Sequence, residues 1–179
     1  MTDVHDPIAR LKDRVKESGW GVTIDETLSF THTELSSLYG LWRAKADAIG
    51  ALPSREDFDI RMLKPFLRHV AILARVIGAD GKSGFRIRLQ GTTMAHFFGD
   101  QQGKMLESAV PPDLVDRWTS IYDALLDARR PLRLRGSYET ENMNYLSTES
   151  FAVPLGNGAA PPISVLSATY FMPRIKSGD

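Results

Sequence analysis

The feature that most constrains the fold of this chain is a change in the spacing of its apolar residues, which occurs at His69 and again at Pro131. Before His69 the apolar positions repeat with helical spacing, and over residues 70–89 they alternate as in strands. Helical spacing returns over residues 92–130, and three strand-like segments follow over residues 132–173. This order predicts an α+β fold: a five-stranded antiparallel sheet with helices inserted between its second and third strands, preceded by N-terminal helices.

The N-terminal segment, residues 1–30, is expected to hold a short helix and an extended linker. Asp6 suits a helix cap, and Ile8, Leu11 and Val15 form one narrow apolar stripe. So short a helix is marginal alone in water, and it must therefore dock on the body of the protein or on a second copy. Residues 31–173 are expected to form the main domain and residues 174–179 a frayed tail.

The start of the main domain carries a local helix signal. Thr31 and Glu34 have the spacing of a capping box, in which each side chain accepts a hydrogen bond from the other residue's backbone N–H. Further along, Gly91 suits a close approach between two backbones, and Thr92 suits the cap of the next helix.

Arginines occupy alternate positions on two of the expected strands, which predicts one wet face of the sheet. They are Arg86, Arg88, Arg133 and Arg135. We expect this face to meet solvent or a partner, and the apolar face to pack on the inserted helices. Arg133 and Arg135 form a basic cluster together with Arg129 and Arg130. This cluster fits a solvated helix end and strand face, and the alternative is a docking patch for an acidic partner or an anionic nucleotide.

Charge and composition exclude several classes of function. The 179 residues hold 22 Lys plus Arg and 22 Asp plus Glu, so the net charge is zero and a nucleic-acid-coating role is not expected. The chain has no cysteine, which excludes disulfides, thiolate zinc sites and iron–sulfur clusters. We see no signal peptide and no membrane span, and we expect a cytoplasmic protein that does not contact a membrane.

Several motifs, in order, resemble one protein family. They are Leu38-Tyr39-Gly40-Leu41-Trp42, Leu52-Pro53-Ser54-Arg55-Glu56-Asp57-Phe58, the segment from Phe85 to Thr92, Phe97-Phe98-Gly99-Asp100 and Gly103-Lys104. With the element order, they resemble the small type-five PAS proteins found largely in alphaproteobacteria, over roughly residues 34–173. The resemblance implies a PAS fold and a signalling or regulatory role in a bacterial cell, and it implies no particular ligand.

PAS-like folds leave space between the sheet and the inserted helices, and apolar and aromatic residues are placed to line it. They are Phe85, Ile87, Leu89, Met94, Phe97, Phe98, Trp118, Tyr122, Tyr145 and Phe151. Tyr122, Tyr145, Ser147 and Ser150 offer polar handles. An aromatic set at these spacings is first of all a packed core, and a ligand cavity is the alternative.

We expect no cofactor, metal site or catalytic residue. A flavin adduct or a coumaroyl chromophore needs a cysteine, and PAS haem sensors usually take a histidine from the long helix before the third strand, which has none here. His96 is the one loose haem candidate. The four histidines are scattered, and no catalytic motif is present.

The sequence therefore predicts a non-enzymatic sensory or regulatory domain that acts by binding a partner protein, with a small molecule in the helix–sheet space as a candidate for controlling that binding. A homodimer through the N-terminal helix is expected. The alternative is a small-molecule carrier or a small enzyme that uses the same space. A third class, nucleic-acid binding by the sheet, would need exposed aromatics on the outer strand face, and those positions hold Arg, Ser, Thr and Glu.

Overall fold

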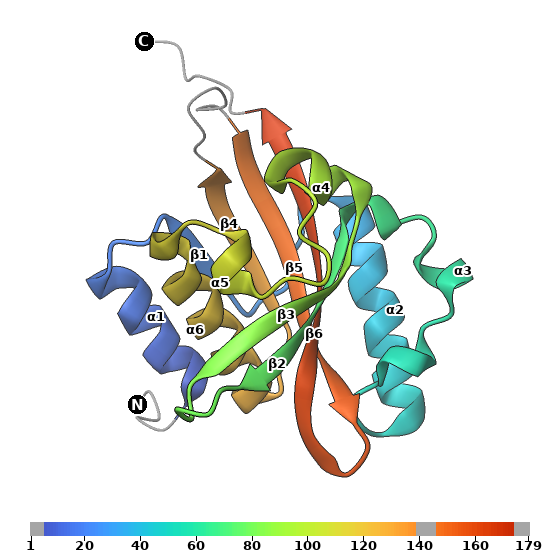
Figure 1. Cartoon of the computed structure of the whole chain (residues 1–179). Coiled ribbons are helices and arrows are strands. Elements are labelled where there is room, and N and C mark those ends of the chain that lie inside the picture. Colours follow the sequence, from blue (N-terminus) through green and yellow to red (C-terminus); the bar gives the residue numbers. More distant parts are fainter. Residues whose placement is uncertain (1–5, 139–145, 174–179) are drawn as a thin grey trace.

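A single antiparallel sheet organises the protein in the computed structural model, which describes residues 6–138 and 146–173. Its strands are β1 (Val22–Asp25), β2 (Val70–Ile77), β3 (Ser83–Gln90), β4 (Leu132–Tyr138), β5 (Leu146–Asn157) and β6 (Ala160–Pro173). They lie in the order β1-β4-β5-β6-β2-β3, and every neighbouring pair is antiparallel (Figure 1). The predicted α+β class is confirmed, with the inserted helices between β3 and β4.

Helices cover both faces of this sheet. They are α1 (Pro7–Glu17), α2 (Thr33–Ile49), α3 (Ile60–Leu63), α4 (Thr92–Phe98), α5 (Leu106–Ala109) and α6 (Pro112–Ala128), with short 3-10 turns η1 (Arg55–Asp57) and η2 (Leu67–His69). Figure 1 shows α1, α5 and α6 on one side and α2 and α3 on the other. Two core clusters lie on these two sides, one with Ala152 and Val165 and the other with Phe151 and Val153. The expectation of one wet sheet face is therefore wrong for the central strands, because β5 and β6 bury side chains of both parities, whereas Arg88 of β3 and Arg135 of β4 are exposed as expected.

The sheet has six strands where the sequence predicts five. The additional strand is β1, which lies in the segment expected to be a linker and pairs with β4 from Val22↔Gly136 to Asp25↔Arg133. Its apolar alternation consists of Val22 and Ile24 alone, and a pattern of two residues is too short to separate a strand from an extended connection. This edge strand joins the N-terminal segment to the sheet.

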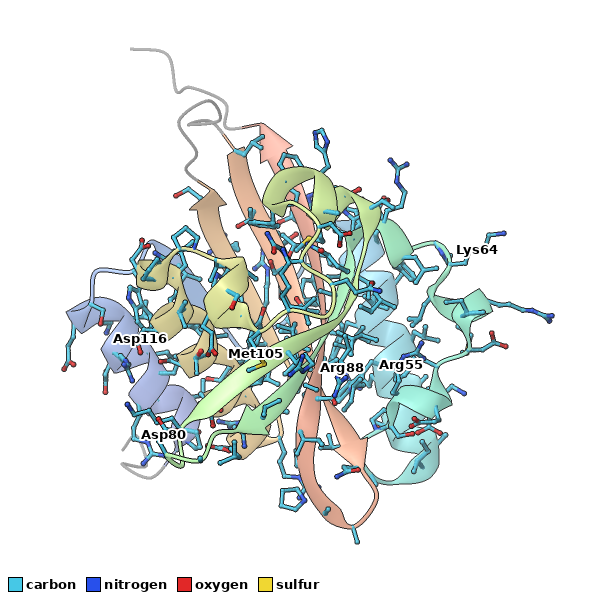
Figure 2. The ribbon with its side chains drawn as sticks, viewed as in Figure 1. Arg55, Lys64, Asp80, Arg88, Met105 and Asp116 are labelled. Carbon is cyan, nitrogen blue, oxygen red and sulfur yellow. The ribbon has the colours of Figure 1, made fainter. Side chains whose placement is uncertain are left out.

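The N-terminal helix docks on the body of its own chain. Asp6 caps it by accepting a hydrogen bond from the N–H of Ile8, as predicted. Ile8 and Leu11 are buried in the same core cluster as α6, and α1 and α6 are in contact. On the solvent side Arg14 of α1 forms an ion pair of 2.8 Å with Asp116 of α6, which Figure 2 labels beside α1. The sequence predicts that the apolar stripe of this helix docks either on the body of the protein or on a second copy, and in the structure it docks on the body.

A buried ion-pair network connects the N-terminal segment to the middle of the sheet. The Arg133 guanidinium donates to the Glu149 carboxylate at 2.7 Å and to Asp25 at 2.9 Å. Glu149 is fully buried and Arg133 is 6% exposed, so Arg133 does not lie on a wet face. The same carboxylate accepts hydrogen bonds from the N–H groups of Thr31 and His32.

This network replaces the predicted capping box at the start of α2. The helix begins at Thr33, its N-cap is His32, and no side chain makes a cap hydrogen bond there. The two N–H groups at residues 31 and 32 are satisfied by Glu149, 117 residues away from His32 in the chain. A sequence search for local caps therefore misses the true partner, because the carboxylate arrives from another strand.

The network predicts a loss of stability in acid. Burial acts to raise the pKa of Glu149, but the N–H groups of Thr31 and His32 and the Arg133 guanidinium outweigh it, and the pKa lies below its ordinary value. At Asp25 burial is likewise outweighed, by hydrogen bonds from Thr27 and Arg133, and this pKa is also lowered. Since both folded-state pKa values lie below the unfolded ones, the stabilisation is complete above about pH 5 and is lost as the pH falls through the folded-state values.

Urea unfolding curves test this prediction. We expect the free energy of unfolding to fall between about pH 5 and about pH 3, and the fall to be shallower in Glu149→Gln, which has no carboxylate to protonate at that position. An equally steep fall in the variant would assign the acid sensitivity to other carboxyl groups.

Candidate functional site

A cavity of about 580 Å³ lies between the sheet and the helices inserted between β3 and β4. Its floor is formed by β5 and β6, and the rest of its lining comes from β2, β3 and β4, from α4, α5 and α6, and from Gly19 and Gly21 before β1. Pockets that hold small organic ligands measure about 300–1,000 Å³, so this cavity has the size of a ligand site.

The floor of the cavity is a row of hydroxyl groups on the two central strands. Thr148 and Ser150 lie two residues apart on β5, and Ser167 and Thr169 lie two residues apart on β6. Ser150 and Thr169 face each other across the strand pair, and their hydroxyl oxygens are 2.8 Å apart. Hydroxyl groups at the centre of a covered sheet face give the cavity hydrogen-bonding capacity that a packed aliphatic layer would lack.

The helical walls are apolar and aromatic. Met94, Phe97 and Phe98 of α4 line one side, and Trp118 and Tyr122 of α6 line another. The rings of Trp118 and Tyr122 stack with their centroids 5.8 Å apart. An apolar wall over a hydroxyl floor suits a ligand that has both an apolar body and polar substituents.

Tyr122 acts in this wall as a neutral hydrogen-bonding group. Burial raises the pKa of its phenol far above the ordinary value, and the hydrogen bond with the Ser167 side chain offsets only part of that effect. The phenol therefore stays protonated at neutral pH and does not serve as a base.

The side chain of Gln90 holds the segment that follows α4. The N–H of Gln101 donates to the Gln90 side chain at 2.7 Å, and the Gln90 amide donates to the carbonyl of Gly99 at 3.1 Å. Farther along, the N–H of Ile87 donates to the carbonyl of Lys104 at 2.9 Å. This segment thereby lies along the outer edge of β3 and forms the rim of the cavity next to α4.

Arg117 of α6 is the cationic side chain of the cavity wall. Among the described residues that line the cavity, none of the others is an arginine or a lysine. Its Nε atom is buried and has no hydrogen-bond partner, and no described residue forms an ion pair with it. A half-buried guanidinium beside an open space is able to bind a negatively charged group there.

The structure brings six of the ten predicted lining residues to the cavity: Ile87, Met94, Phe97, Phe98, Trp118 and Tyr122. Phe85 is fully buried in the core beside Tyr122, with ring centroids 5.3 Å apart, and does not line the cavity. Phe151 and Leu89 lie in or against the core cluster on the opposite face of the sheet. Tyr145 lies outside the described residues. Of the predicted polar handles, Tyr122 and Ser150 line the cavity, and the Ser147 hydroxyl donates to the carbonyl of Met172.

A β-bulge explains the position of Leu89. The register passes from Ile72↔Leu89 to Leu73↔Ile87, so Arg88 is an extra residue in β3. The alternation that puts Ile87 toward the cavity is reversed after the bulge, and Leu89 packs on the α2 side. A period of two counted along the sequence does not detect such an insertion.

The residues predicted from the sequence do not include Thr148, Ser167 and Thr169 of the floor or Arg117 of the wall. The signal for the floor was present: Ser and Thr recur at spacing two on strands that the chain order places in the middle of the sheet. Arg117 carried no sequence signal, because its importance depends on which acids lie near it in space.

The described residues contain no group of three or more histidine, aspartate and glutamate side chains placed to hold a metal ion. His96 is exposed on α4 and does not line the cavity. Within the same ranges, none of the helices has the length and apolar character needed to cross a bilayer.

Comparison with known proteins identifies the family. A family model described as a PAS domain, of type five, matches residues 30–169. No curated protein and no solved structure matches the chain. The matched segment contains α2 to α6, β5 and the part of β6 that carries the floor residues Ser167 and Thr169. With a sheet and inserted helices consistent with that fold, the chain belongs to the type-five PAS domain family.

Proposed function

We propose that this PAS domain is a non-enzymatic regulatory module whose cavity binds a small organic molecule and whose output is contact with a partner protein. PAS domains in general have sensory and regulatory roles, and they commonly mediate protein interactions. The observation that supports ligand binding here is the cavity itself, with a hydroxyl floor, aromatic walls and one arginine. A core that served packing alone would be filled to crystal-like density.

The part of the wall best placed to transmit occupancy is α4 with the segment after it. Met94, Phe97 and Phe98 line the cavity, while no residue of this seven-residue helix is fully buried. Gly99 and Gly103 have positive φ values of 74° and 85°, which glycine adopts without strain. A ligand that presses on the three lining side chains therefore changes a surface that a partner can contact.

A homodimer remains part of the proposal, but the apolar stripe of α1 does not support it. Ile8 and Leu11 are covered by the chain's own core, so the stripe offers no open apolar face to a second copy. A dimer would use other surfaces, and light scattering of the full chain measures it directly.

An enzyme would require ionisable groups that converge in the cavity. The ionisable side chains of the described lining are Asp113, Arg117 and Tyr122. Asp113 is exposed, and the Tyr122 phenol is held neutral. This set supports binding better than proton transfer.

Native mass spectrometry of freshly purified protein, repeated after denaturation, tests the proposed function. We expect a bound small molecule in the native spectrum and its loss on denaturation. In Ala71→Phe, a phenyl group is added at the cavity wall, and the protein should no longer carry the bound small molecule. Ala44→Phe adds the same group at an exposed position of α2, and this variant should still carry it. Wild-type protein of ligand-free mass in both spectra, or an occupied Ala71→Phe, would contradict ligand binding in this cavity.

A further inference from the structure

Arg117 indicates the chemical class of the ligand, an inference that rests on the ligand-binding role proposed above. We propose that the cavity binds an organic monoanion with an apolar body, and that the Arg117 guanidinium binds its carboxylate group. Three observations support this: the state of the Arg117 side chain, the charges around it and the composition of the opposite walls.

The Arg117 side chain differs from the other inward-placed arginines of the described chain. Arg75 is paired with Asp123 and Asp127, and Arg133 is paired with Asp25 and Glu149. Arg117 has a buried Nε atom and no partner. An unpaired buried donor destabilises the folded protein, and it is therefore expected where a ligand supplies the acceptor.

No acid among residues 6–138 and 146–173 forms an ion pair with this guanidinium. Asp113 lines the same cavity one helical turn earlier, but it is exposed and forms no ion pair with Arg117. Asp116, the adjacent residue, pairs instead with Arg14 of α1, and both side chains are about half exposed or more. The positive charge of Arg117 is thus available to a group inside the cavity.

The rest of the lining sets the character of the anion. Leu73, Ile87, Met94, Phe98 and Trp118 present apolar surface, and the floor hydroxyls accept or donate hydrogen bonds. Because the described lining has one cationic side chain, a single negative charge is matched there, and a second charge on a phosphate would stay uncompensated. A carboxylic acid with an aliphatic or aromatic body matches this lining, because its carboxylate can bind the cationic side chain and its body can contact the apolar surface.

Matched acids and amides test the inference on the full chain by isothermal titration calorimetry. The probes are octanoate with octanamide and 3-phenylpropanoate with 3-phenylpropanamide, which differ within each pair only at the charged group. We expect at least one acid to bind about tenfold or more tightly than its amide, because a hydrogen bond to a charged group contributes more than a neutral one.

Two substitutions at Arg117 and one elsewhere complete the experiment. Arg117→Met should abolish the preference for the acid, and Arg117→Lys should retain part of it. Arg88→Met removes the same charge from an exposed position on β3, labelled in Figure 2, and should leave the preference unchanged. Since Arg117 has no partner among the described residues, Arg117→Met should also unfold at the same urea concentration as the wild type or a higher one, which separates lost binding from lost folding.

The outcomes distinguish the two proposals. Amides that bind as tightly as their acids, or an acid preference that survives Arg117→Met, would overturn anion recognition while leaving the cavity a ligand site. A neutral molecule released by the wild-type protein in the native mass spectrum would also overturn it. A protein that binds none of the four probes and carries no small molecule would overturn the ligand-binding role as well.

Discussion

Replacing Arg133 by methionine is expected to lower the free energy of unfolding by about 3–5 kcal/mol, because removing one partner of a buried ion pair leaves the other charge uncompensated. Glu149 is fully buried and receives the Arg133 guanidinium at 2.7 Å. Without that cation the carboxylate retains the N–H groups of Thr31 and His32, which satisfy hydrogen bonds but carry no full charge. Urea unfolding followed by circular dichroism at neutral pH measures the loss.

Two comparisons make this result specific to the buried network. In the double variant Arg133→Met, Glu149→Gln no charge is left uncompensated between these two positions, and part of the stability should return. Arg43→Met breaks an ion pair whose side chains are 65% and 74% exposed, and exposed pairs contribute at most about 1 kcal/mol. An Arg133→Met protein as stable as Arg43→Met would show that the network does not stabilise the fold.

Gly91→Ala is expected to destabilise the fold by about 3 kcal/mol, the upper part of the range for an added methyl in a packed site. Gly91 lies at the junction of β3 and α4, with its N–H on the carbonyl of Val70 at 2.8 Å. A Cβ atom there would stand 2.2 Å from the carbonyl oxygen of Leu67 and 2.4 Å from that of Arg68. Backbone carbonyls cannot swing away as a side chain can, so η2 or α4 must move.

Gly40→Ala is the matched control for this substitution. Gly40 lies inside α2, and a Cβ there would meet nothing within 4 Å. Alanine is favoured over glycine in a helix, so this variant should gain about 0.5–1 kcal/mol in the same assay. Since φ at residue 91 is −70°, a conformation that alanine adopts freely, a loss there reports the close contact and not backbone strain. Equal stability of the two variants would contradict the close contact.

The order of the long elements could be predicted from the sequence because each carries several turns or several alternations of pattern. The hairpin of β2 and β3 and the long helix α6 are such elements, and so is the stripe of α1. The features that could not be predicted from the sequence depend on contacts between distant segments. The four residues of β1 become a strand because β4 has a free edge, and the start of α2 is capped by Glu149 from β5.

The candidate site was partly predictable for the same reason. The aromatic residues of α4 and α6 reach the cavity because helical spacing places them on one face. Phe151 shares its parity with Tyr145 and Val153, and parity alone does not say which of the two covered faces of the sheet such a residue meets. The prediction of Phe151 at the cavity is therefore wrong, because it packs on the α2 side. On β5 the residues that face the cavity are the hydroxyl residues Thr148 and Ser150, because the cavity lies over that face of the strand.

The position of β1 has a practical meaning for where this domain should be cut. The family match starts at residue 30, five residues after β1 ends. A fragment trimmed to that match loses Asp25, the second acid on Arg133, and leaves the backbone N–H and C=O groups along one side of β4 without their strand partners. Unpaired strand edges recruit other chains, so such a fragment invites self-association that belongs to the trimming and not to the native protein.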